Sequence, residues 1–250
     1  MIFDLTGRTA LITGAGQNVG AGIARFLAAQ GASIAVNDID RERAELVAAG
    51  VVELGGRSVA VPFDVTDYAS VLAGVAAAEL ALGPIDILVN NAGNAGAAVM
   101  VPTQFRDSTP ESWIPAIRVN LAGVMHCCRA VVNGMCDRGW GRIITISSSA
   151  ATIGTDIGVA PYSAGKGGGL AFTRTLAIEV ARHGVTANTL ALGLQAQVDP
   201  SVTAYFASTI PVGRTGTPED IGAACVWLAS NEAAWVTGQT IEINGGAVTT

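Results

Sequence analysis

Short, largely apolar runs recur along the chain and alternate with alanine-rich segments of helical composition. Apolar runs that lack strict polar alternation are typical of strands covered on both faces of a parallel sheet. Strands that alternate with helices predict an α/β fold with a doubly wound parallel sheet of about seven strands, whose ligands bind beyond the carboxyl ends of the strands. The seven predicted strands are Arg8–Thr13, Ser33–Asn37, Ser58–Phe63, Ile85–Asn90, Arg142–Ile146, Thr186–Leu190 and Thr240–Ile243.

Two segments depart from this regular pattern. A helix is expected to begin near residues 109–110, but Pro115 follows only a few residues later. Because proline is tolerated only in the first turn, we expect this helix to kink at Pro115 or to begin nearer Ile114. The segment 193–211 is long for a connection, and connections of that length are commonly binding elements. No linker is visible, so we expect a single domain over residues 1–250.

A glycine-rich turn follows the first strand and leads into the helical stretch Ala21–Gln30. Glycines in such a turn let backbone N–H groups approach a pyrophosphate at the positive end of the helix. The spacing matches Thr-Gly-x-x-x-Gly-x-Gly, with Asn18 where the middle glycine is expected. Asparagine tolerates positive φ better than most residues, so the turn is predicted to keep its shape. We therefore predict a Rossmann-like dinucleotide site formed by Gly14, Gln17, Asn18, Val19 and Gly20.

Tyr162 and Lys166 lie four residues apart, downstream of the serine cluster 147–149. On a helix this spacing stacks the phenol and the ammonium on one face. Because a nearby cation favours the phenolate, we expect the pKa of Tyr162 to be lowered toward neutrality. Three glycines, residues 167–169, follow directly and weaken the helix, which indicates close packing against a neighbouring helix of this or another subunit.

With the glycine turn and the Tyr162/Lys166 pair taken together, the chain resembles the short-chain dehydrogenase/reductase family over nearly all of its length. Each further motif is weak alone, but their order along the chain is specific. These motifs are Asp64-Val65, Asn90-Asn-Ala-Gly93, Val119-Asn-Leu121, Gly141-Arg-Ile-Ile144, Gly213–Ile221, Leu228–Ser230, Val236–Gly238 and Ile243–Gly246.

The resemblance implies that Tyr162 is the general acid/base and that Lys166 activates it and binds the nicotinamide ribose. Asn120 would hold a water in a proton relay, and the alternative is an amide bonded only to nearby backbone. A serine would orient the substrate oxygen. Counting along the strand selects Ser148, whereas counting back from Tyr162 selects Ser149. A strand register is fixed by pairing while a loop absorbs an extra residue, so we predict Ser148.

Asp38 ends the second predicted strand, about 20 residues past the glycine turn. A carboxylate there accepts hydrogen bonds from the adenosine ribose and repels a 2′-phosphate. No lysine or arginine occupies positions 15–17 or 39, although Arg41 lies nearby in the sequence, and Arg43 is taken as a surface charge. The predicted cofactor is therefore NAD.

The remaining cofactor contacts are implied by the resemblance. Asp64 and Val65 would contact the adenine, and Asn91, Ala92 and Gly93 would lie along the adenosine side. A plain asparagine-glycine turn is the alternative for the last three residues.

After the sixth strand the family usually has Pro-Gly, followed four residues later by a threonine at the carboxamide end of the cofactor. This chain has Leu192, Gly193 and, at the place of the threonine, Gln197. Gly193 is expected to remain a cofactor contact. Gln197 would either alter the anchoring of the nicotinamide or make the same contact with a longer amide.

Composition narrows the class of protein. Hydrophobic residues make up 50% and charged residues 14%, which indicates surface buried between subunits, and the resemblance implies a homotetramer. A net charge of −6 with scattered basic residues argues against nucleic acid as a partner. Apolar runs shorter than roughly 18 residues and an amino terminus without a basic region predict a cytoplasmic protein with no membrane partner. The four cysteines and two histidines form no metal-binding pattern.

These observations predict an NAD-dependent dehydrogenase/reductase that interconverts a secondary alcohol and a ketone. The expected pocket walls, residues 99–101, 153–157 and 205–206, carry few charges, so a small apolar or cyclic substrate is favoured. One alternative is a 3-oxoacyl thioester reductase of fatty-acid type, although such enzymes usually prefer NADPH and dock an acidic carrier protein. The other alternative is a non-catalytic NAD-binding protein. The intact serine, tyrosine, lysine and asparagine argue against it.

Overall fold

All seven predicted strands pair in parallel into one sheet. The computed structural model describes residues 2–94, 100–196 and 200–249. The strand order is β3-β2-β1-β4-β5-β6-β7, so the chain starts in the middle of the sheet and winds outward in both directions. The strands are β1 (Thr9–Ile12), β2 (Ser33–Val36), β3 (Ser58–Ala60), β4 (Ile87–Asn90), β5 (Gly141–Ser148), β6 (Val185–Leu192) and β7 (Thr240–Ile243). The predicted α/β, doubly wound, Rossmann-like sheet is therefore confirmed.

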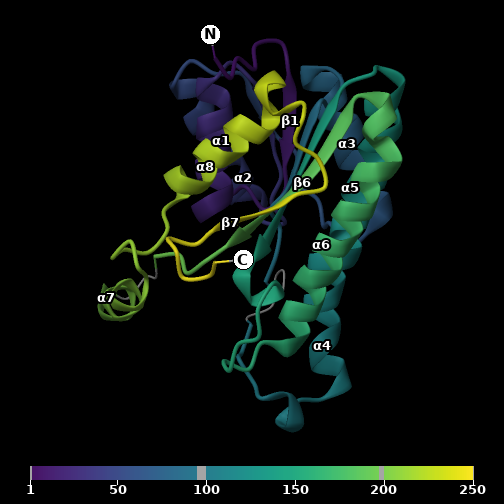
Figure 1. The fold of residues 1–250 in the computed structure, drawn as a ribbon. Coiled ribbons are helices and arrows are strands. Elements are labelled where there is room, and N and C mark those ends of the chain that lie inside the picture. The colour runs from purple at the N-terminus through teal and green to yellow at the C-terminus, as the bar shows by residue number, and fades with distance from the viewer. Residues whose placement is uncertain (1, 95–99, 197–199, 250) are drawn as a thin grey trace.

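Helices cover both faces of this sheet (Figure 1). One face carries α1 (Asn18–Ala29), α2 (Arg41–Glu53) and α8 (Pro218–Ala229). The other carries α3 (Tyr68–Leu82), α4 (Pro110–Ile117), α5 (Gly123–Asp137) and α6 (Ala160–Val180). Because successive side chains of a strand point to opposite faces, Ala10 and Ile12 of β1 enter the core beneath α1, while Leu11 enters the core beneath α5. Single 3₁₀ turns span Phe105–Asp107, Ser149–Ala151, Ala181–His183 and Asn231–Ala233.

The strand β5 is longer than its apolar run suggests. It continues from Gly141 to Ser148 and pairs with β6 along its whole length, ending with Ser148 opposite Leu192. Because parallel pairing on this side fixes the register, the first two serines of the cluster belong to the strand. Ser149 begins the 3₁₀ turn that follows. The end of β5 therefore lies within the serine cluster.

For the helix that contains Pro115, the predicted start near Ile114 is wrong. The helix begins at Pro110 rather than near Ile114, and Pro115 lies inside α4. The irregularity comes later, as a π-helical turn over Arg118–Ala122 that joins α4 directly to α5. A π turn adds a residue to the helical ladder, and such turns are frequent at functional sites.

The segment 193–211 is not an open loop. Its second half forms α7 (Pro200–Thr209), which lies off the main body beside the carboxyl ends of the strands (Figure 1). A helix at this edge can cover a ligand bound there. Within the described ranges, none of the helices is both long and apolar enough to span a bilayer.

Candidate active site

The glycine turn has the backbone shape that the sequence predicted. Gly14 has φ +59° and Asn18 has φ +46°, both in the left-handed region. The helix α1 begins at Asn18, its N-cap residue Gln17 makes no side-chain capping bond, and its first turn holds no acidic residue. The first N–H groups of α1 are thus left to an external anion. This fits the pyrophosphate of a dinucleotide.

Hydrogen bonds join the glycine turn to the turn after β4. Asn91 Nδ2 donates to the carbonyls of Thr13, at 3.0 Å, and Gly14, at 2.8 Å. The hydroxyl of Thr13 accepts from the backbone N–H groups of Asn91 and Ala92, both at 3.1 Å. A side chain on Gly20 would collide with the carbonyl of Gly14. Thr13, which the sequence analysis did not select as a site residue, therefore holds the two turns together.

Asp38 lies buried beside the glycine turn. Its Oδ2 accepts from the N–H of Gly16 at 3.0 Å, and its Oδ1 accepts from the N–H of Asp40 at 3.0 Å. A Cβ at Gly16 would lie 2.7 Å from Asp38 Oδ2 and 2.6 Å from Arg43 Cβ. Arg43 is therefore close to the turn, although its sequence position marked it only as a surface charge. Its guanidinium pairs with Asp40 at 3.2 Å.

Asp64 and Val65 form a tight turn at the end of the third strand region. Asp64 Oδ1 accepts from the N–H of Thr66 at 2.8 Å, and the carbonyl of Val65 lies 2.9 Å from His126 Nδ1. Val65 also lies close to Thr13 and Ala92, across a gap too small to hold a water. The turn thus lies beside the glycine turn, at the carboxyl ends of the strands.

Tyr162 lies in the first turn of α6, near enough to the hydroxyl of Ser148 for that hydroxyl to act on its pKa. Burial raises the pKa of Tyr162 above its ordinary value, and the hydroxyl of Ser148 opposes this only in part. The expected lowering of this pKa is therefore wrong. The Nζ atom of Lys166 lies 6.0 Å from the centre of the tyrosine ring, so the desolvation of a phenolate outweighs the attraction of the cation.

Lys166 is buried one helical turn later. Its Nζ donates to the carbonyl of Ile146 in β5 at 2.7 Å. Burial lowers the pKa of Lys166 to about 8. A Cβ at Gly93 would lie 2.8 Å from this Nζ and 3.1 Å from Asn120 Oδ1. Only glycine therefore leaves room at position 93 for both polar groups.

Asn120 lies in the π turn, where its amide N donates to the carbonyls of Ala116, at 2.8 Å, and Asn94, at 2.6 Å. The alternative given above, an amide bonded only to nearby backbone, therefore describes the side-chain nitrogen of Asn120. Its Oδ1 is buried and makes no hydrogen bond to any described residue. A buried acceptor of this kind calls for a water or ligand donor, which is what a proton relay would supply.

The three serines face three different partners. Ser147 donates to the carbonyl of Lys166 at 3.3 Å, and Ser149 donates to Glu242 Oε2 at 2.8 Å. Ser148 accepts from the N–H of Ala150 at 3.2 Å, and its hydroxyl acts to lower the pKa of Tyr162. This arrangement is consistent with the choice of Ser148 by the strand register.

Gly193 follows β6 directly. Its N–H donates to the carbonyl of Ile243 at 3.0 Å, and a Cβ there would lie 2.7 Å from that of Asn244. The glycine thus lets the turn after β6 approach the chain after β7. Gln197, at the place of the family's threonine, lies outside the described residues.

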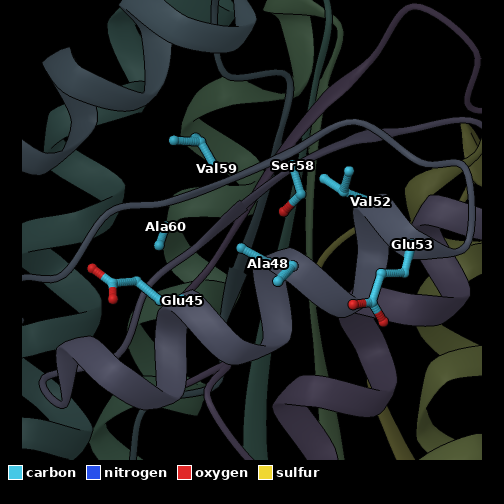
Figure 2. A pocket seen from close by; sticks show the side chains of 8 residues that line it. Glu45, Ala48, Val52, Glu53, Ser58, Val59 and Ala60 are labelled. Carbon is cyan, nitrogen blue, oxygen red and sulfur yellow. The ribbon is translucent and has the colours of Figure 1, made fainter.

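An open hollow of about 440 Å³ lies elsewhere, between α2 and the edge strand β3. Glu45 and Glu53 lie at its two ends, with Ala48 between them (Figure 2). It lies on the flank of the sheet and contains none of the predicted site residues. In the described part of the chain, no three histidine, cysteine, aspartate or glutamate side chains are grouped as a metal site would need.

Known proteins similar to this chain share its length and fold. A family model described as enoyl-(acyl carrier protein) reductase matches residues 14–248. An acetoacetyl-CoA reductase from Shinella zoogloeoides is 38% identical, over 96% of this chain and 98% of its own. A 5-keto-D-gluconate 5-reductase from Escherichia coli is 35% identical, over 98% and 97%.

A solved structure of a similar protein has the same fold as this chain. The gluconate 5-dehydrogenase from Burkholderia cenocepacia, in complex with NADP and tartrate, has a TM-score of 0.89 at 35% identity and covers 98% of this chain and 96% of its own. Because such relatives match almost the whole chain, it belongs to the short-chain dehydrogenase/reductase family and is an oxidoreductase acting on CH–OH and keto groups.

Proposed function

We propose that the protein is an NAD-dependent dehydrogenase/reductase that interconverts a secondary alcohol and a ketone through Ser148, Tyr162 and Lys166. The observation that carries the proposal is the meeting of Tyr162 and Ser148 next to the buried Lys166, whose Nζ donates to the carbonyl of Ile146 in β5. Two hydroxyls that meet at the carboxyl edge of the sheet can bind one alcohol oxygen between them.

In the oxidation direction, Ser148 holds the substrate hydroxyl and Tyr162 takes its proton as the carbonyl forms. A bound nicotinamide would supply the acceptor for the hydride that leaves the same carbon. Lys166 keeps the phenolate of Tyr162 stable and binds the nicotinamide ribose. The free Oδ1 of Asn120 accepts a hydrogen bond from the relay water behind Lys166.

The proposed cofactor contacts lie along the same edge of the sheet. The turn of Gly14, Gln17, Asn18, Val19 and Gly20 supplies amides to the pyrophosphate. The groups at the adenosine side and at the nicotinamide end are Asp38, Asp64, Val65, Asn91, Ala92, Gly93 and Gly193.

The preference for NAD is carried by the charge of Asp38. Its carboxylate is buried at the end of β2 and accepts one N–H on each oxygen. Each oxygen retains a lone pair for a ribose hydroxyl, whereas a 2′-phosphate would meet like charge. The nearby cation Arg43 is engaged by Asp40. We therefore propose NAD for this chain, although the solved relative holds NADP.

Kinetics with both cofactors test this preference. We expect kcat/KM with NAD⁺ to exceed that with NADP⁺ at a saturating alcohol concentration. Asp38→Asn keeps the shape and one carbonyl acceptor but removes the charge, so it is expected to raise the NADP⁺ value relative to the NAD⁺ value. The matched variant Asp64→Asn, at the next strand end, should leave the ratio unchanged. A wild-type preference for NADP⁺ contradicts the role given to Asp38.

For the substrate we propose a small apolar or cyclic alcohol or ketone. Val101, Ile153, Ile157 and Tyr205 are exposed apolar side chains on the segments expected to line the pocket. Val99 lies outside the described residues. The competing candidate is a 3-oxoacyl thioester reductase, which the similarity to an acetoacetyl-CoA reductase favours. Assays with cyclic ketones, 5-ketogluconate and acetoacetyl-CoA decide between them, and a preference for the thioester overturns the apolar assignment.

The proposal includes a homotetramer in the cytoplasm. Large apolar side chains are exposed on both helix layers, for example Leu46 and Leu54 on the layer of α2 and Ile114 and Ile178 on the layer of α6. Such surface is commonly buried by association. Fractionation of cells that express the protein at its natural level checks the location.

A further inference from the structure

Glu242 is a carboxylate at the active-site edge of the sheet that neither the proton transfer nor the cofactor uses. It lies in β7, opposite Ala191 of β6. The hydroxyl of Ser149 donates to its Oε2 at 2.8 Å, and Asn244 Nδ2 donates to the same oxygen at 3.1 Å. Its Oε1 is buried without a hydrogen-bond partner among the described residues. The side chain is thus oriented by two donors that both bind one oxygen.

Asn244 extends this connection to the end of the chain. Its amide nitrogen also donates to the carbonyl of Val248 at 3.1 Å, and its Oδ1 accepts from the N–H of Gly246 at 3.0 Å. Gly193 packs closely against Asn244. The 3₁₀ turn Ser149–Ala151 is called the serine turn below. Through Glu242, the serine turn is connected to the carboxyl-terminal tail and to the turn after β6.

The bond to Ser149 bears directly on Ser148. Ser148 is the last residue of β5, and Ser149 starts the following 3₁₀ turn. The strand register decides which of the two adjacent serines faces Tyr162, because a shift of the register by one residue would exchange the positions of their side chains. Since Glu242 engages the hydroxyl of Ser149, that side chain is occupied, and the backbone of the turn is held where Ser148 meets Tyr162.

We propose that Glu242 is a positioning residue for the reaction, which acts through Ser149 to fix the serine turn and to select Ser148 as the hydroxyl that orients the substrate. The inference rests on the proposed function of Ser148 and Tyr162. Glu242 touches neither substrate nor cofactor in this assignment.

A double-mutant cycle tests the pathway through Ser149. Glu242→Leu and Ser149→Ala each break the same bond, so each should lower kcat about tenfold, and the double variant should be no worse than either single one. Glu242→Gln keeps a carbonyl acceptor for the hydroxyl and should retain most of the activity. Affinity for NADH, measured by fluorescence, should be unchanged in all four proteins, which excludes general unfolding.

Three outcomes overturn the inference while the proposed function stands. The first is wild-type kcat in Glu242→Leu, and the second is additive losses in the double variant. The third is a loss in Ser149→Ala that is as deep as that of Tyr162→Phe, because Ser149 itself would then touch the substrate.

A readout that needs no turnover separates this inference from the proposed function. The N–H of Ala150 donates to Ser148 Oγ, so hydrogen–deuterium exchange in a peptide covering residues 147–153 reports the position of the turn. Glu242→Leu should accelerate exchange there, and Glu242→Gln should not. Unchanged exchange in Glu242→Leu refutes the positioning role, whereas a wild type that turns over no alcohol or ketone refutes only the proposed function.

Discussion

At the scale of single residues, burial moves the two central ionisable groups in opposite directions. It raises the pKa of Tyr162 and lowers the pKa of Lys166 to about 8, because in each case the charged form loses its hydration. Burial thus favours the neutral phenol of Tyr162 over its phenolate. Spacing in the sequence identified both residues, but not the direction in which the tyrosine shifts.

Tyr162→Phe tests the proton transfer. It removes only the ionisable oxygen, so kcat is expected to fall by about 10² to 10⁴ while NADH affinity is kept. Tyr68→Phe, on α3, is the matched control and should retain wild-type kcat. If the Tyr162 variant keeps more than roughly a tenth of the activity, another group is the acid/base.

Lys166 makes the stability of the fold depend on pH. Its pKa is about 8 in the folded protein against 10.5 ordinarily, so between these values the unfolded chain binds more protons and stability rises with pH. Lys166→Met has no group that titrates at this position. The free energy of unfolding of the wild type, relative to that of the variant, should rise by about 1 kcal/mol between pH 7 and pH 9. Urea titrations at both pH values measure this difference, and a constant difference refutes the shift.

At the scale of elements, packing within one subunit explains Gly165 and Gly169 of α6, but not Gly167. A Cβ at Gly169 would lie 2.9 Å from the carbonyl of Asn120, and one at Gly165 would lie 2.9 Å from the carbonyl of Ala116. Small residues on α6 therefore let α4 and the π turn come close. This approach places Asn120 near Lys166, across Gly93.

Two alanine substitutions on α6 separate packing from propensity. Gly169→Ala brings a Cβ against backbone and should destabilise the fold by about 1 to 3 kcal/mol, as overpacking does. Gly167→Ala meets no atom closer than 3.8 Å and should stabilise it by about 1 kcal/mol through helix propensity. Denaturant titration of both variants gives the comparison. Equal effects at the two positions would show that packing against the π turn is unimportant.

At the scale of the whole molecule, association is expected to bury the apolar surface that one subunit leaves exposed. Light scattering should give four times the 25.2 kDa mass of one chain across a range of concentrations. Leu54→Glu and Ile178→Glu place a charge on opposite helix layers, at side chains that are 76% and 72% exposed. A fall in mass for one of them identifies the layer that forms an interface. A wild type that stays monomeric at all concentrations contradicts the tetramer.

The features that depend on neighbouring residues could be predicted from the amino-acid sequence. Apolar runs predicted all seven strands, and the glycine turn was predicted with Asn18 in a positive-φ position. The spacing of Tyr162 and Lys166 was enough to place them on one helix. Each of these signals is local, because backbone sterics and helical or strand periodicity act over a few residues.

The features that join distant segments became visible in the folded chain. The π turn after Pro115, the helix α7 and the closeness of Arg43 to the glycine turn were not predicted. The bond between Ser149 and Glu242 joins residues 93 positions apart. Such contacts, and the burial that shifts the pKa of Tyr162, depend on how strands pair and helices pack, and side chains far apart in the chain meet only after folding.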